Sequence, residues 1–219
     1  MVAKMEDRVL AEDGPDLEKA YSLKSPDDNI ALYERWADTY DQDFAQRMDY
    51  QLPRHVADCF IQHKSTNGAV LDVGAGTGLL ADCLSDQQDL IIDAIDISAA
   101  MLKVASTKGL YRNTIVADLT KPLSIKNDTY GAIISSGTFT HGHVGPDVLD
   151  ELLRICKQGA LFVLSINAQH FVSRGFEAKF EQLNTMIDNF ALHTVSIYGS
   201  CGDSEHQSDE GYIAVFKKA

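Results

Sequence analysis

The sequence has few of the features that mark a membrane-bound, exported or metal-binding protein. No apolar run reaches the roughly 20 residues that a membrane-spanning helix needs, and residues 1–14 contain no apolar stretch of signal-peptide length. The four cysteines, at positions 59, 83, 156 and 201, lie far apart, without a CxxC pair and without histidines at zinc-ligand spacing. These absences predict a cytoplasmic protein with reduced thiols and no metal site.

Positive charge is also scarce. The 219 residues include 19 Lys and Arg against 32 Asp and Glu, which gives a formal net charge of -13. An acidic surface repels a phosphate backbone instead of displacing its counterions. We therefore expect no nucleic-acid partner and no membrane partner, and a small molecule as the substrate.

The chain length suits one hydrophobic core. Residues 25–219 are therefore predicted to form a single domain, and the polar, acidic residues 1–24 to form a flexible arm or lid. Ser25 and Pro26 mark the start of a helix, because Ser is favoured at the cap and Pro at the first helical position.

Short apolar runs alternate with amphipathic segments in the middle of the chain, at 69–74, 90–96, 114–119, 130–136 and 160–167. Apolar runs of this kind are typical of parallel strands that helices cover on both faces. One of the helices between them is expected to begin at Pro146 and to end just before Gly159. The series predicts an α/β fold with a doubly wound, Rossmann-like sheet.

The C-terminal part departs from this alternation. Ser173 is expected to cap a helix that runs to about Asn189, and two strands follow at 192–199 and 211–218. No helix fits in the loop between these two strands, so they should pair antiparallel.

A glycine-rich loop follows the first strand and precedes a helix. It comprises Gly74, Ala75, Gly76, Thr77 and Gly78. A strand, glycine loop and helix in this order are typical of a site for a nucleotide-like cofactor. The dinucleotide fingerprint places its third glycine where Leu79 stands, and no Lys-Ser or Lys-Thr pair follows for a phosphate loop. A nicotinamide-dependent oxidoreductase is therefore the weaker alternative.

Acidic residues stand at or near the ends of three successive strands. Asp72 would repel a pyrophosphate but attract the ammonium and sulfonium groups of S-adenosylmethionine; alternatively it braces the loop by accepting backbone hydrogen bonds. Asp96 is placed to accept hydrogen bonds from ribose hydroxyls. Asp118 is placed to accept from an adenine amino group, with Ile97 and Leu119 beside the ring. The three acids together predict a cofactor site.

These segments resemble the class I S-adenosylmethionine methyltransferases. The resemblance rests on DVGAGTG at 72–78, the acid in DAIDIS at 93–98 and ADL at 117–119, and it spans about residues 28–167. KGLYRNTIVADLTKPL, AIISSGTFTHGHVGP and SINAQHFVSRGFEAKF look more narrowly like the methyltransferase-like family that includes the Williams-Beuren-region protein. The resemblance implies a seven-stranded sheet of order 3-2-1-4-5-7-6 with the last strand reversed, S-adenosyl-L-methionine as cofactor and S-adenosyl-L-homocysteine as product.

The helical segment at 33–44 also resembles one that many of these enzymes lay over the cofactor. Tyr33 and Tyr40 would reach the methionine carboxylate and Trp36 would line the inner face; alternatively the helix only packs its aromatic face on the sheet. Met101 and Ser135 complete the predicted cofactor-binding set.

The acceptor should lie beyond the carboxyl ends of the fourth and fifth strands, where open α/β sheets bind ligands. His141 and His143 are the candidate general bases there, because imidazole titrates near neutrality. Alternatively Thr140 or His143 caps the following helix, and a metal held by His141, His143 and His170 would lack nearby acids to complete its ligand set. A non-catalytic binder of S-adenosylmethionine or its product has the same cofactor loop and is the second alternative.

Overall fold

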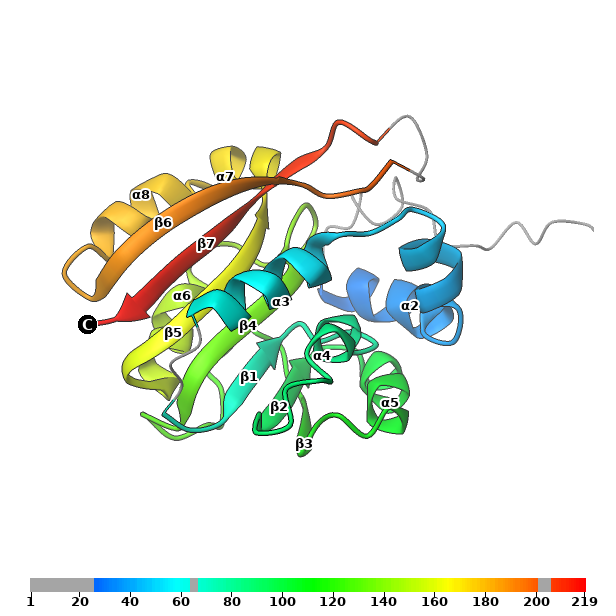
Figure 1. The fold of residues 1–219 in the computed structure, drawn as a ribbon, viewed down its shortest axis with the longest axis horizontal. Coiled ribbons are helices and arrows are strands. Elements are labelled where there is room, and N and C mark those ends of the chain that lie inside the picture. The colour runs from blue at the N-terminus through cyan, green and yellow to red at the C-terminus, as the bar shows by residue number, and fades with distance from the viewer. Residues whose placement is uncertain (1–25, 64–66, 201–205) are drawn as a thin grey trace, which may run out of the picture.

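The computed structural model describes residues 26–63, 67–200 and 206–219, and it is built around one twisted sheet (Figure 1). The sheet has seven strands in the order β3-β2-β1-β4-β5-β7-β6. The strands are β1 (Val70–Val73), β2 (Ile92–Asp96), β3 (Asn113–Val116), β4 (Tyr130–Phe139), β5 (Cys156–Asn167), β6 (Ile187–Ser196) and β7 (Glu210–Lys218). The predicted fold class and strand order are confirmed, as is the reversed β7, which pairs antiparallel with both β5 and β6.

The first five strands are parallel, so their carboxyl ends meet at one edge of the sheet. All four residues of β1 are buried, since β1 lies between β2 and β4 and both of its faces are covered. Asp72 of β1 pairs in register with Ala94 of β2 and Ile134 of β4. The central position of β1 puts the glycine loop that follows it at the middle of this edge.

Helices cover both faces of the sheet (Figure 1). They are α2 (Pro26–Trp36), the π-helix η1 (Tyr40–Gln46), α3 (Leu52–His63), α4 (Leu79–Cys83), α5 (Ala99–Thr107), α6 (Val148–Ile155), α7 (Ala168–Arg174) and α8 (Phe176–Gln182). On one face Phe60 of α3 and Leu80 of α4 pack in one buried cluster with Val163 of β5. On the other, Leu149 of α6 and Phe176 of α8 join a larger cluster.

Two predicted helices have different boundaries. The helix expected from Pro146 ends at Ile155, and Cys156 already belongs to β5, where it pairs with Tyr130. Gly159 lies inside that strand with a positive φ of 76° instead of ending a helix. Strand pairing with β4, where Cys156 lies opposite Tyr130, outweighs the local helical pattern here.

The prediction of one continuous helix from Ser173 to about Asn189 is also wrong. Asn167 caps α7 by accepting a hydrogen bond from the backbone N–H of His170 at 3.1 Å. Gly175, with φ 74°, ends α7 and α8 follows, so a left-handed glycine divides the segment into two short helices. Strand β6 then begins at Ile187, five residues earlier than expected. Likewise, β3 ends at Val116, short of the predicted 119.

The predicted arm at 1–24 and the Ser25 cap lie outside the described residues. The helix predicted to begin at Pro26 is present as α2, and it packs on α5 through Leu32, Trp36 and Met101. Among the described residues, no helix is long and apolar enough to cross a membrane.

Candidate active site

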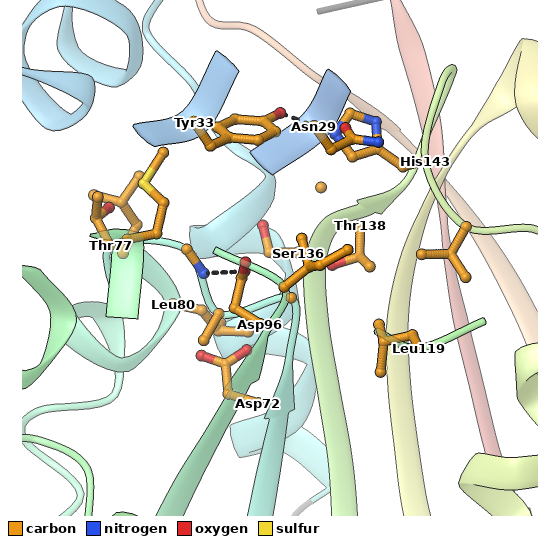
Figure 2. Close-up of a pocket in the computed structure, with 18 of the residues that line it drawn as sticks. Asn29, Tyr33, Asp72, Thr77, Leu80, Asp96, Leu119, Ser136, Thr138 and His143 are labelled. Carbon is orange, nitrogen blue, oxygen red and sulfur yellow. Dashed lines mark hydrogen bonds between the residues drawn. The ribbon is translucent and has the colours of Figure 1, made fainter. Parts of the chain in front are cut away.

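A cavity of about 210 Å³ lies at the carboxyl edge of the sheet, between the strand ends and α2 (Figure 2). Its walls come from the glycine loop, from the ends of β2 and β4, from the segment after β3 and from α2. Thirteen predicted site residues line it: Tyr33, Tyr40, Asp72, Gly74, Ala75, Gly76, Thr77, Asp96, Ile97, Met101, Asp118, Leu119 and His143. The fold therefore gathers side chains that are up to 110 positions apart in the sequence.

Asp72 is the most deeply buried acid of the cavity, at 1 % exposure. Its Oδ2 accepts a 2.6 Å hydrogen bond from the hydroxyl of Tyr111, and its Oδ1 has no hydrogen-bond partner among the described residues. Burial, assisted by the nearby charge of Asp96 and opposed by the Tyr111 bond, raises the pKa of Asp72 to about 7. A buried carboxylate with an unpaired oxygen is unfavourable until a cation or a donor reaches it.

Asp96 holds the glycine loop in place. Its Oδ2 accepts from the backbone N–H of Gly76 at 2.8 Å (Figure 2), and its Oδ1 accepts from that of Ser98 at 2.8 Å. Burial raises the pKa of Asp96, and these backbone hydrogen bonds oppose the rise. The bracing role that the sequence left open for Asp72 is thus performed by Asp96.

Glycine is required at position 74 for two reasons. Its φ of 68° lies in the left-handed region, and a Cβ there would overlap the side chain of Thr138 on β4. Gly76 has φ 55°, but a Cβ there would meet no atom within 4 Å. The backbone of the loop therefore packs directly against β4 at Gly74 and borders open space at Gly76.

Asp118 lies two residues beyond the end of β3. Its Oδ1 accepts from the backbone N–H of Thr120 at 2.9 Å and from its hydroxyl at 2.6 Å, and Lys121 lies 3.1 Å from Oδ2. Partial burial acts to raise the pKa of Asp118, but these bonds and the lysine hold it below its usual value. Asp118 is therefore ionised at neutral pH beside Ile97 and Leu119 in the same cavity.

Helix α2 is tied to the loop between β4 and α6. The hydroxyl of Tyr33 lies 3.0 Å from Nε2 of His143, and Nδ2 of Asn29 donates to the carbonyl oxygen of Gly142 at 2.9 Å (Figure 2). Nδ1 of His143 lies 2.8 Å from the carbonyl oxygen of His141. Since a carbonyl only accepts, Nδ1 carries the proton and Nε2 accepts from Tyr33. Burial lowers the pKa of His143 to about 4, so its ring is neutral at pH 7.

The π-helix η1 is tied to the glycine loop. Asp41 accepts a 2.5 Å hydrogen bond from the hydroxyl of Thr77 and pairs with Lys108 of the α5 C-cap at 2.8 Å. Lys108 also pairs with Asp82 of α4 at 2.6 Å. These contacts link the segment that covers the cavity to the two helices that flank its floor.

Four predicted site residues do not line the cavity. Ser135 is fully buried beneath it and donates to the carbonyl oxygen of Val73 at 2.7 Å. Trp36 packs with Met101 in the cluster under α2, and Gly78 is the left-handed N-cap of α4. The ring of His141 instead lies against that of His170, with centroids 5.7 Å apart. Ser135 and Trp36 differ from their neighbours in the cavity because the pleat of β4 and the turn of α2 direct successive side chains to different sides.

The sequence patterns did not predict several of the residues that line the cavity. Asn29 precedes Tyr33 by four residues, and this spacing places both side chains on one face of α2. The spacing could therefore have predicted that Asn29 lines the cavity. Ser136 lines the cavity where Ser135 was expected, and its buried Oγ has no hydrogen-bond partner among the described residues. Thr138 and Tyr50 carry no signal in the sequence, because only the bend of β4 and the packing of η1 bring them to the cavity. Within the described ranges, no group of three or more His, Cys, Asp or Glu residues is arranged to hold a metal.

Comparison with known proteins finds a methyltransferase domain within this chain. A model described as a methyltransferase domain matches residues 71–164, which include the glycine loop and the ends of β1 to β4. Human methyltransferase-like protein 27 is 32% identical over 150 residues, which are 67% of this chain and 60% of that protein. Residues 71–164 therefore form a methyltransferase domain. The chain spans less than two thirds of the length of this relative.

Two further comparisons place the methyltransferase domain among known proteins. The bovine 18S rRNA (guanine-N(7))-methyltransferase is 41% identical over 66 residues, which are 30% of this chain and 23% of that one. A TehB-like SAM-dependent methyltransferase from Corynebacterium glutamicum has the same fold, with a TM-score of 0.59 and 19% identity over 86% of this chain and 99% of that one. The cofactor that this family implies is S-adenosyl-L-methionine.

Proposed function

We propose that this chain transfers the methyl group of S-adenosyl-L-methionine to a small-molecule acceptor. We assign cofactor binding to the cavity residues Tyr33, Tyr40, Asp72, Gly74, Ala75, Gly76, Thr77, Asp96, Ile97, Met101, Asp118 and Leu119, all of which line one space. The observation that carries the proposal is the pair of carboxylates of Asp72, which is buried, and Asp96, which is partly buried, near the ends of adjacent parallel strands. S-adenosylmethionine supplies a sulfonium-activated methyl group and an ammonium group.

The charges of the cavity suit such a ligand. The charge of Asp96 helps to raise the pKa of Asp72, and a bound cation opposes that effect. Oδ1 of Asp72 and Oγ of Ser136, which have no partner in the part of the chain that the structure describes, belong to residues of the same cavity, so polar groups of the ligand would satisfy both. A pyrophosphate would meet repulsion from both acids, which argues against a nicotinamide cofactor.

The residues over the cavity provide alignment, exclusion of water and a route for a proton. Helix α2 and the loop after β4 meet above the cavity through Tyr33 and His143. We assign to His143 the role of final proton acceptor: Tyr33 passes its proton to Nε2 as its oxygen takes one from the acceptor. His141 lines neither described cavity, so we assign it no direct part.

A small-molecule acceptor is supported over nucleic acid by the charge of the chain. The net charge of -13 opposes the approach of RNA. The name of the bovine relative specifies a guanine of rRNA, so RNA is the alternative acceptor in the test below.

The test is a turnover assay with purified protein and S-adenosylmethionine. The small-molecule fraction and the total RNA of a cell extract are supplied separately, and S-adenosylhomocysteine is measured by mass spectrometry. We expect product with the small-molecule fraction and none with RNA. Product with RNA alone would contradict the acceptor class. Tight binding of S-adenosylhomocysteine without turnover in either fraction would identify a non-catalytic binder.

A further inference from the structure

A second, smaller cavity opens beside the first, beyond the carboxyl ends of β4 and β5. Five residues line both cavities: Tyr33, Tyr40, Tyr50, Gly137 and His143. A group held in the second cavity therefore lies next to whatever occupies the first. The proton route assigned to Tyr33 and His143 stands at the boundary between the two.

Aromatic rings form a continuous wall of this second cavity. Tyr40 and Phe44 stack with centroids 5.0 Å apart, Phe44 and Tyr50 are 5.6 Å apart, and Tyr50 and Tyr198 are 6.0 Å apart. Phe139 of β4 lines the same space. Ring faces and edges of this kind pack well against another ring in stacked or edge-on geometry.

No described residue that lines the second cavity is charged at neutral pH. Its polar groups are the hydroxyls of its four tyrosines and the side chains of Thr140, Ser165, Asn167 and His143, and the low pKa of His143 keeps that ring neutral. A carboxylate, phosphate or ammonium group placed here would lose its hydration without gaining a described ionic partner. The cavity thus selects against charged groups.

Asn167 presents a donor to this cavity. Its Oδ1 accepts from the backbone N–H of His170 at 3.1 Å as the cap of α7, and its side chain is buried. That bond fixes the orientation of the amide and leaves Nδ2 for a ligand. A fixed N–H donor favours a ligand that offers a neutral oxygen or nitrogen as hydrogen-bond acceptor.

We propose that the second cavity binds the methyl acceptor, and that this acceptor is a small uncharged aromatic compound whose hydroxyl or amino group receives the methyl. The inference rests on the proposed methyl transfer. A new O–CH3 or N–CH3 bond forms from a lone pair of the acceptor as the S–CH3 bond breaks, and the electrons of that bond remain on sulfur. The acceptor's proton passes to the Tyr33 oxygen, and the Tyr33 proton passes to Nε2 of His143.

The test measures binding of matched probes to protein saturated with S-adenosylhomocysteine. The probes are phenol and aniline, which are uncharged, benzoate and benzylamine, which are charged at neutral pH, and cyclohexanol, which is not aromatic. We expect phenol and aniline to bind at least tenfold more tightly than the other three. Equal or tighter binding of a charged probe or of cyclohexanol would overturn the inference, as would the absence of saturable binding by both uncharged rings.

Asn167→Asp is the matched variant, since a carboxylate still caps α7 but adds a charge and removes the donor. We expect phenol affinity to fall at least tenfold and benzylamine affinity to rise. Asn167 does not line the first cavity, so affinity for S-adenosylhomocysteine should stay within twofold. Unchanged probe preference in a folded variant would overturn the inference. Failure of the wild-type protein to bind S-adenosylhomocysteine would instead defeat the proposed function itself.

Discussion

The hydroxyl of Tyr111 donates a 2.6 Å hydrogen bond to Oδ2 of Asp72, and so a residue just before β3 fixes a carboxylate of β1, 39 positions away. The pKa of Tyr111 is raised, chiefly by its own burial and also by the charge of Asp72, which keeps the hydroxyl protonated as a donor. Since one oxygen of Asp72 is occupied in this way, the other is the one available to a ligand in the cavity.

Asp72→Asn should stabilise the ligand-free protein at high pH. Folding raises the pKa of Asp72 from 3.8 to about 7, so its contribution to stability is complete below its unfolded pKa and is lost as the pH rises through about 7. The variant should gain about 1–3 kcal/mol over the wild type at pH 8, and the gain should shrink toward pH 4. Thermal denaturation across this range measures it, and a difference independent of pH would contradict it.

The same variant should bind S-adenosylmethionine more weakly. An ionised Asp72 attracts the cationic ligand, so wild-type affinity should rise as the pH passes through about 7. Asn at this position removes the charge, and we expect a loss of about 1–3 kcal/mol and a flatter pH profile. Calorimetry on both proteins separates this effect from titration of the ligand, which is common to the two. Parallel pH profiles would exclude Asp72 from the cofactor site.

Asp96→Ala should weaken cofactor binding by about 1–3 kcal/mol, because it removes the acceptor for ligand hydroxyls and releases the backbone N–H of Gly76. Asp89→Ala is the control, since Asp89 is exposed and lies outside the cavity. Calorimetry should show the loss only in the first variant. Equal affinities of the two folded variants would remove Asp96 from the site.

Asp41→Asn should loosen the segment over the cavity. The change removes the ion pair with Lys108 and weakens the acceptor for Thr77, and a partly exposed network of this kind contributes about 1 kcal/mol. We expect a several-fold loss of cofactor affinity and faster hydrogen exchange in η1. Asp43→Asn removes the same charge from an exposed position of η1 and should change neither. If the backbone amides of η1 exchange at the same rate in the two variants, Asp41 does not hold this segment.

Tyr33→Phe tests the proton route. It removes the hydroxyl that lies 3.0 Å from Nε2 of His143 but keeps the ring in place. Once an acceptor is known, kcat should fall about 10- to 100-fold, within the range of general acid–base effects, with little change in KM for the acceptor. His143→Gln should cause a similar fall in kcat. An unchanged kcat in Tyr33→Phe would show that methyl transfer needs only the alignment of donor and acceptor, without this proton route.

The sequence determined the parts of this protein that depend on local pattern. The buried runs around Val70 and Ile134 have to be covered on both faces, and this requirement predicts a parallel sheet between helices. Glycines in left-handed conformations and acids near successive strand ends are also local features, so residues 74–78 and the three acids could be placed at one edge of the sheet in advance. Their binding roles remain predictions.

Only the tertiary structure decided how elements end and which side chains meet. Cys156 leaves the helical pattern for β5, where it lies opposite Tyr130 of β4, and Gly175 divides a predicted helix in two. The contacts of Asp72 with Tyr111 and of Asp41 with Thr77 join residues more than 30 positions apart, which no spacing rule connects. Local propensity acts over a few residues, whereas a cavity is defined by distances that exist only once the sheet has formed.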